Sequence, residues 1–265
     1  MRYFVYNHHD FWQWEDSNSE LMDSEVVFMW SDWPFGNAVE TLQALGKKVI
    51  VYEHGFGAMF DYELNDRDPI ADGYLVLGQE SKESLTRAGV DPSKILITGN
   101  PVYDDIKKTK HTGNEALFVA LHWDRDVSLY NQTKFDQLRN AYPQFNWTAK
   151  VTDKTGDLIA DKKWYNDVEG DILEDIKKKL PNYDMVFTPR HSTFESIARL
   201  MGIPVYVIDK EETYRLEGEH EAIPFNNTYL RIGDKLPEQK PFNMDEYIKR
   251  PSLSFDLILD WTKTL

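Results

Sequence analysis

The chain has 265 residues, a formal net charge of −15, no cysteine and eight tryptophans. This length can form one large domain or two small ones, and no apolar run reaches the ~18 residues that a membrane-spanning helix needs. The lack of cysteine excludes disulfides and thiolate metal sites, and the acidic balance argues against broad, sequence-independent binding to duplex DNA or an anionic membrane. The start has neither the basic nor the apolar region of a signal peptide, so we expect a cytoplasmic protein.

Short apolar segments alternate with helical patterns through the first half of the chain, which indicates an α/β unit. We expect strands at 2–6, 26–30, 48–52, 73–77 and 94–98, and helices at 35–45 and 79–88. Polar and aromatic residues follow several of these strands, as His8 and His9 follow the first. The carboxyl ends of strands are the edge where open α/β sheets bind ligands, so these loops are the places to look for a site.

The segment Glu53-His54-Gly55-Phe56-Gly57 follows the third expected strand. Glu53 and His54 are suitable residue types for a general base or for holding an acceptor hydroxyl, and they are our catalytic candidates. The two glycines permit tight turns and a close approach of a ligand. The alternative is a structural loop with a buried histidine.

A domain boundary is predicted near residue 110. The fifth strand is followed by Gly99-Asn100-Pro101, a sharp exit from the sheet, and the polar run 107–114 reads as a linker. We therefore expect one domain over 1–110 and a second over 111–265. In the second we expect strands at 116–121, 147–152, 185–188 and 205–208, and helices at 129–142, 167–180, 193–201 and 255–265.

The stretch 184–208 reads as one strand–helix–strand unit whose turn holds polar residues. Arg190 supplies positive charge there, and Ser192 or Thr193 can cap the helix or bond a phosphate oxygen. Free backbone N–H groups and the helix dipole favour an anion at such a turn. The alternative is an ordinary helix N-cap beside an exposed arginine.

Several short motifs resemble those of one superfamily, the GT-B glycosyltransferases, and within it the branch shared with UDP-N-acetylglucosamine 2-epimerases. In chain order the motifs are His54-Gly55, Thr98-Gly99-Asn100-Pro101 with Asp104, His122 with Arg125, Ser192-Thr193 with Glu195, and Glu212-Thr213 with Arg215. The resemblance covers roughly residues 48–218. The chain departs from the epimerases at 191–196, where they carry Ser-Gly-Gly and paired glutamates, and it is shorter than the usual members of either group.

The resemblance implies a fold of two small doubly wound, Rossmann-like halves facing a cleft, with a nucleotide-sugar site in the second half. A UDP-sugar is the expected donor, with its ribose on Glu195. The other donor-binding residues that it implies are His122, Arg125, Arg190, His191, Ser192 and Thr193. Because positive charge would replace a metal at the leaving diphosphate and no Asp-x-Asp motif lies between the halves, we expect neither metal nor cofactor.

The sequence thus predicts a glycosyltransferase with an unidentified acceptor, and it leaves other functions open. One is a UDP-sugar 2-epimerase or hydrolase, and another is a non-catalytic nucleotide-binding module. A transferase acting on modified DNA bases is a further alternative, although the net charge of −15 weighs against nucleic acid.

Overall fold

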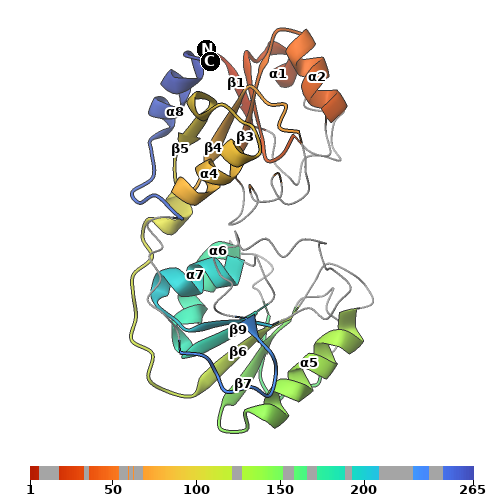
Figure 1. Cartoon of the computed structure of the whole chain (residues 1–265), viewed down its shortest axis with the longest axis vertical. Helices are drawn as coiled ribbons and strands as arrows, with labels where there is room; N and C mark the ends of the chain where they lie inside the picture. Colours follow the sequence, from red (N-terminus) through yellow and green to blue (C-terminus); the bar gives the residue numbers. More distant parts are fainter. Residues whose placement is uncertain are drawn as a thin grey trace. The chain divides into compact units, whose positions relative to one another are not determined.

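The computed structural model describes residues 1–5, 18–32, 36–53, 59, 62, 68–120, 127–151, 158–165, 172–188, 193–208, 229–238 and 247–265. The chain divides into two compact units, Met1–Asp104 with Asn243–Leu265 as unit 1, and Asp105–Phe242 as unit 2 (Figure 1). Each unit is built on a parallel sheet with packed helices, which confirms the predicted α/β class with two Rossmann-like halves. Among the described helices, none is long and apolar enough to cross a membrane.

In the described part of unit 1, five parallel strands lie side by side in chain order. They are β1 (Tyr3–Val5), β2 (Val26–Met29), β3 (Lys48–Tyr52), β4 (Gly73–Val76) and β5 (Ile95–Ile97). The helices are α1 (Asn18–Asp23), α2 (Gly36–Ala44), α4 (Gln79–Arg87) and α8 (Phe255–Thr262), with short 3-10 turns at Pro92–Lys94 and Pro101–Tyr103. All residues of β2 and β4 are buried, as expected for strands that are covered on both faces.

The two faces of this sheet are covered by different parts of the chain. Right-handed crossovers between strands in chain order put every connecting helix on one face, and Val39 of α2 and Leu85 of α4 share one apolar cluster there. The opposite face, with Phe28 and Ile50, packs against α8 through Ile258. Figure 1 shows this last helix, in blue, against the sheet of unit 1. The C-terminal helix therefore completes the core of the first unit.

The segment that returns to unit 1 is held by main-chain bonds to the residues that directly follow β4 and β5. Lys249 N donates to Leu77 O and Leu253 N donates to Thr98 O, each at 2.8 Å. Gly99 has a φ of +69°, and a Cβ at this position would collide with the carbonyl of Lys249. The glycine is therefore required both by the turn and by the close approach of the returning chain.

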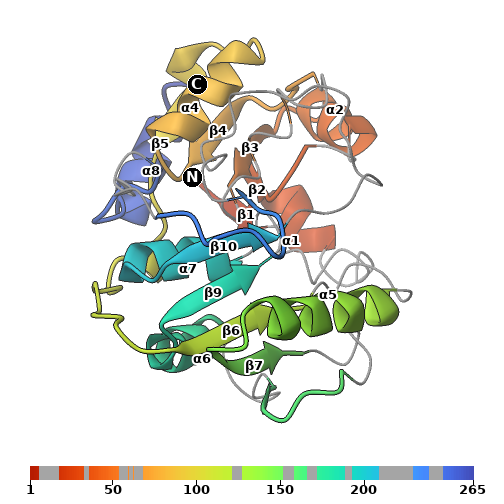
Figure 2. The ribbon, with the colours of Figure 1, turned by 60° about the horizontal axis from the view of Figure 1, so that its bottom comes forward.

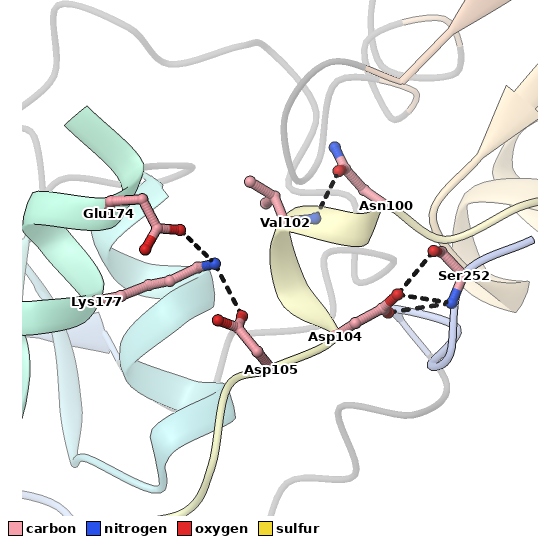
Figure 3. A network of polar contacts seen from close by, with 7 residues as sticks. All are labelled: Asn100, Val102, Asp104, Asp105, Glu174, Lys177 and Ser252. Carbon is pink, nitrogen blue, oxygen red and sulfur yellow. Dashed lines mark hydrogen bonds and ion pairs between the residues drawn. The ribbon is translucent and has the colours of Figure 1, made fainter. Parts of the chain in front are cut away.

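Two adjacent aspartates lie where the chain passes from unit 1 to unit 2 (Figure 3). Within unit 1, Asp104 accepts hydrogen bonds from Ser252 N at 3.0 Å and from Ser252 Oγ at 2.7 Å. Within unit 2, Asp105 accepts from Lys177 Nζ at 2.8 Å, and Lys177 also bonds Glu174. Each side of the junction is thus fixed to its own unit.

The observed units differ from the predicted ranges 1–110 and 111–265. The crossing falls between Asp104 and Asp105, and Asn243–Leu265, including the closing helix, belongs to unit 1. The physical reason is that α8 buries its apolar side against the sheet face opposite to the one that the described connecting helices α2 and α4 cover.

Unit 2 holds a sheet of six described parallel strands in the order β11-β10-β9-β6-β7-β8. The strands are β6 (Glu115–Val119), β7 (Asn146–Lys150), β8 (Lys163–Trp164), β9 (Met185–Thr188), β10 (Val205–Ile208) and β11 (Tyr229–Leu230). The helices are α5 (Val127–Ala141), α6 (Ile172–Lys179) and α7 (Thr193–Met201), with a 3-10 turn at Leu180–Asn182. The sequence did not predict β8, β11 or α1.

This sheet is doubly wound, because the chain reverses its direction of travel. From β6 it moves outward to β7 and β8, then returns to the other side of β6 for β9 and moves on to β10. Figure 2 shows β7, β6, β9 and β10 side by side in this order. The strand order is therefore 3-2-1-4-5-6, that of the dinucleotide-binding fold. Phe135 and Leu138 of α5 cover one face, and α6 and α7 lie on the other (Figure 1).

We expect α8 to be essential to the stability of unit 1. Ile258 is 9% exposed in the cluster under the sheet, whereas the adjacent Leu257 is 54% exposed. Ile258→Ala should lower the free energy of unfolding by about 2–4 kcal/mol, because it removes buried methyl groups and leaves a cavity. Leu257→Ala, the matched control, should change it by less than about 0.5 kcal/mol. Urea denaturation followed by circular dichroism measures both, and equal losses would contradict the role given to α8.

Candidate functional site

The reversal of strand order in unit 2 lies between β6 and β9. These strands are neighbours, with Ala116 opposite Met185 and Phe118 opposite Phe187. At such a reversal the loops beyond the two carboxyl ends diverge to opposite faces of the sheet and leave room for a ligand. Of the predicted donor residues, His122 and Arg125 follow β6 in sequence, and 190–195 follow β9. The topology thus places the carboxyl ends of β6 and β9, the strands that precede the two predicted motifs in the sequence, at the same edge of one sheet.

The structure describes only part of the predicted site. Glu53, Thr193 and Glu195 are among the described residues. The others lie outside the described residues, and their roles stay predictions: His54, His122, Arg125, Arg190, His191 and Ser192. The Glu212-Thr213 motif with Arg215 lies outside them as well.

Helix α7 begins at Thr193, and four residues of the sequence separate it from Thr188, the last residue of β9. Its first turn contains Glu195, which is fully buried and pairs with Arg199 one turn later. Arg199 donates to Oε1 of Glu195 from Nη2 at 2.9 Å and from Nε at 3.2 Å. The pair neutralises the carboxylate inside the unit, and it fixes the direction in which that carboxylate points.

In unit 1, Glu53 lies directly beyond β3 and is 4% exposed. Its Oε2 accepts from Leu77 N at 2.8 Å, and its Oε1 accepts from Ser81 Oγ at 3.0 Å. Leu77 lies in the turn between β4 and α4, and Ser81 lies in the first turn of α4, whose N-cap residue is Gly78. Through these two bonds Glu53 joins the end of β3 to the start of α4, and its catalytic role stays a prediction.

A second buried carboxylate, Asp32, follows β2 and was not among the predicted site residues. Its Oδ2 accepts from Tyr74 Oη at 2.7 Å and from the main-chain N–H groups of Ile70 and Ala71, and its Oδ1 accepts from Tyr62 Oη. Burial, and then the charge of Asp32, raise the pKa values of Tyr62 and Tyr74 well above the ordinary range. In the sequence, the only local sign of this network was an acidic residue that follows a fully apolar strand.

A third feature missed from the sequence is a lysine at the carboxyl end of a buried strand. Lys150 is the last residue of β7 and is 2% exposed. It lies opposite Val119 of β6, one strand away from the reversal. A single lysine after four other strand residues carries no pattern that distinguishes it from a strand-end surface residue.

Comparison with known proteins finds resemblance in structure alone. No family model and no curated protein matches the sequence. The UDP-N-acetylglucosamine 2-epimerase of Neisseria meningitidis, solved with UDP-N-acetylglucosamine, is 14% identical with a TM-score of 0.49 over 75% of this chain and 66% of that one. HepE of Anabaena, solved with UDP and glucose, is 11% identical with a TM-score of 0.44 over 72% of this chain and 61% of that one.

A third similar structure, the lipopolysaccharide outer core galactosyltransferase WaaB, is 15% identical with a TM-score of 0.39 over 78% of this chain and 61% of that one. By their descriptions, one of these proteins is a UDP-N-acetylglucosamine 2-epimerase and another is a galactosyltransferase. The chain spans about three fifths of the length of HepE and WaaB.

The Glu195–Arg199 pair gives a stability prediction. Glu195→Ala should cost about 3–5 kcal/mol, because the buried guanidinium loses its carboxylate. The double variant Glu195→Ala with Arg199→Met should recover about 2 kcal/mol of this loss of stability, since neither charge of the pair then stays buried. The exposed pair Asp260–Lys263 is the matched control, and Asp260→Ala should cost less than about 1 kcal/mol. Urea denaturation measures the cycle, and additive losses at 195 and 199 would contradict the coupling.

The Asp32 network predicts a dependence on alkaline pH. Since the native pKa of Tyr74 lies above its unfolded value of about 10, the native state keeps a proton that the unfolded state loses, and stability falls as pH rises above about 10. Tyr74→Phe removes this linkage together with the bond to Asp32. The variant should be less stable at pH 8. The difference between its free energy of unfolding and that of wild type should shrink by about 1.4 kcal/mol per pH unit above pH 10. Urea denaturation from pH 8 to 11 tests this, and exposed Tyr165→Phe, the control, should show no change in this difference.

Proposed function

We propose that the chain is a glycosyltransferase that moves a sugar from a nucleotide-sugar donor, expected to be a UDP-sugar, to an unidentified acceptor. The observation that carries the proposal is the reversal of strand order at β6 and β9. In sheets of this order the nucleotide binds beyond the carboxyl ends at the reversal, and both predicted donor motifs follow those two strands in the sequence.

The start of α7 is the proposed diphosphate site. Free N–H groups of its first turn and the helix dipole favour an anion there, and the hydroxyls of Ser192 and Thr193 add hydrogen-bond donors. Glu195 is the proposed ligand of the ribose hydroxyls. Its pairing with Arg199 in α7 would hold the carboxylate in one orientation.

The proposed reaction is a displacement at the anomeric carbon. An acceptor oxygen forms the new bond to that carbon while the bond to the β-phosphate oxygen of UDP breaks, and His54 takes the acceptor proton. Arg190 and His191, with His122 or Arg125, would stabilise the charge on the departing diphosphate, so the reaction needs no metal. Glu53 supports this chemistry by holding the turn after β4, through Leu77 and Ser81.

Calorimetric titration of the full chain with UDP, UDP-glucose, UDP-N-acetylglucosamine, GDP, CDP and CMP tests the donor site. We expect selective binding of a uridine nucleotide and a loss of at least about tenfold in Arg190→Ala, since a charge-assisted bond to phosphate is removed. Arg139→Ala is the matched control, because Arg139 bonds Asp161 on the exposed side of α5. If wild type binds none of these nucleotides, the proposed function falls.

Product analysis then separates the transferase from the alternative that the motifs leave open. A UDP-sugar 2-epimerase or hydrolase converts its donor without an acceptor, whereas a transferase leaves it unchanged. Incubation of the purified chain with UDP-N-acetylglucosamine alone, followed by NMR of the sugar, gives the answer directly.

A further inference from the structure

The polar run 107–114, which the sequence predicts to be the linker between the units, is fastened to unit 2. Thr109 N donates to the carbonyl of Met201, the last residue of α7, at 2.8 Å. Further along the run, Gly113 N donates to Oδ1 of Asp184 at 2.8 Å. Main-chain groups that are bonded to a folded unit move with that unit, so this run does not supply the freedom that its composition indicates.

The chain passes from unit 1 to unit 2 over two exposed residues. Tyr103, which is 3% exposed, is the last buried residue on the side of unit 1, and Ile106, which is 7% exposed, is the first on the side of unit 2. Asp104 and Asp105 lie between them, and the boundary between the units falls at the peptide that joins these two aspartates. The freedom of this crossing is therefore limited to a very short stretch of main chain.

Each of the two aspartates is tied to its own side of that peptide (Figure 3). Asp104 has helical backbone angles, with φ −67° and ψ −33°, and its carboxylate accepts from N and Oγ of Ser252. The carboxylate of Asp105 accepts from Lys177 Nζ at 2.8 Å, and the same ammonium bonds Glu174 at 2.9 Å. The bonded structure of each unit thus extends as far as this one peptide.

We propose that the peptide between Asp104 and Asp105 is the pivot of this crossing, and that the bonds from Ser252 and Lys177 confine the turning of the units to it. Rotation about ψ of Asp104 and φ of Asp105 redirects the chain and breaks none of these bonds, because each carboxylate stays with its own unit. Hinges in proteins are a few such residues that absorb changes in φ and ψ. Loss of the Lys177 bond adds the next pair of dihedrals to the flexible link. The inference goes beyond the proposed function and does not depend on it.

Double electron–electron resonance between two spin labels, on the full chain without nucleotide, tests this pivot. The chain has no cysteine, so Glu40→Cys on α2 of unit 1 and Gln137→Cys on α5 of unit 2, both exposed positions, take one label each. In Lys177→Met and in Asp105→Ala the distance distribution should broaden about 1.4-fold, because the spread of a flexible link grows as the square root of its length and the link doubles. Lys178→Met, an exposed neighbour on α6, is the matched control and should leave the width unchanged.

Three outcomes of the label measurement overturn the inference. One is a distribution as narrow in Lys177→Met and Asp105→Ala as in wild type, because the bond would then confine nothing. Equal broadening in Lys178→Met is another, since the lost charge and not the lost bond would be the cause. Broadening in Lys177→Met alone is the third, because Asp105→Ala breaks the same bond and leaves Lys177 paired with Glu174. The side chain of Asp105 is 66% exposed, so Asp105→Ala should fold even where Lys177→Met does not, and its width then decides alone.

Hydrogen exchange followed by NMR tests whether the polar run 107–114 is fixed to unit 2. The amides of Thr109 and Gly113 should exchange more slowly than in an unstructured peptide of residues 105–115, because both are bonded within the unit. Exchange as fast as in that peptide would make the run itself the flexible connection, and the pivot at Asp104 and Asp105 would be rejected.

Discussion

Right-handed crossovers between parallel strands put all connecting helices on one face when the strands run in chain order, so the other face needs a cover from elsewhere. Unit 1 has this order, and α8 provides the cover through Ile258. The chain must therefore come back from unit 2, and its return is accommodated at Gly99 and beside Asp104. The motif with Gly99 and Asp104, which resembles the segment that closes an amino-terminal domain, therefore provides the contacts that hold the returning segment.

Unit 2 covers both faces of its sheet with helices from one contiguous segment. Its chain reverses direction once, so its own crossovers place helices on both faces. The reversal also creates the edge at which β6 and β9 end together, and buried charges gather near it. Glu195 and Arg199 compensate each other, and Lys150 lies one strand away. A cover for both faces and a place for a ligand thus follow from one change in strand order.

The sequence predicts well where local pattern and burial coincide. The strands 185–188 and 205–208 and the helix 193–201 have the same bounds in the structure, because apolar residues, Gly202 and Pro204 mark each boundary locally. β8 was missed because its two residues sit in a polar stretch and form a strand only by pairing with β7. The unit to which α8 belongs could not be read from its own sequence, since its amphipathic pattern fits any apolar face.

The candidate site was predictable to a similar degree. Strand ends with polar residues located the edge in unit 2, but the surroundings of single side chains depend on contacts distant in sequence. Asp32 is bonded by groups 30 to 42 residues away, and Glu53 by groups 24 and 28 residues away. No local spacing encodes such contacts, so the sequence did not predict the network of Asp32 or the bonds that Glu53 accepts from Leu77 and Ser81.

The return of the chain to unit 1 has a consequence for synthesis on the ribosome. Unit 2 is contiguous from Asp105 to Phe242, so all its residues have been synthesised before Asn243–Leu265 are made. Unit 1 begins first and yet lacks one face of its core until Asn243–Leu265 leave the exit tunnel. Unit 2 can thus complete its core before unit 1 does, although unit 1 is translated first, and the sheet face with Phe28 and Ile50 lacks the cover of α8 until then.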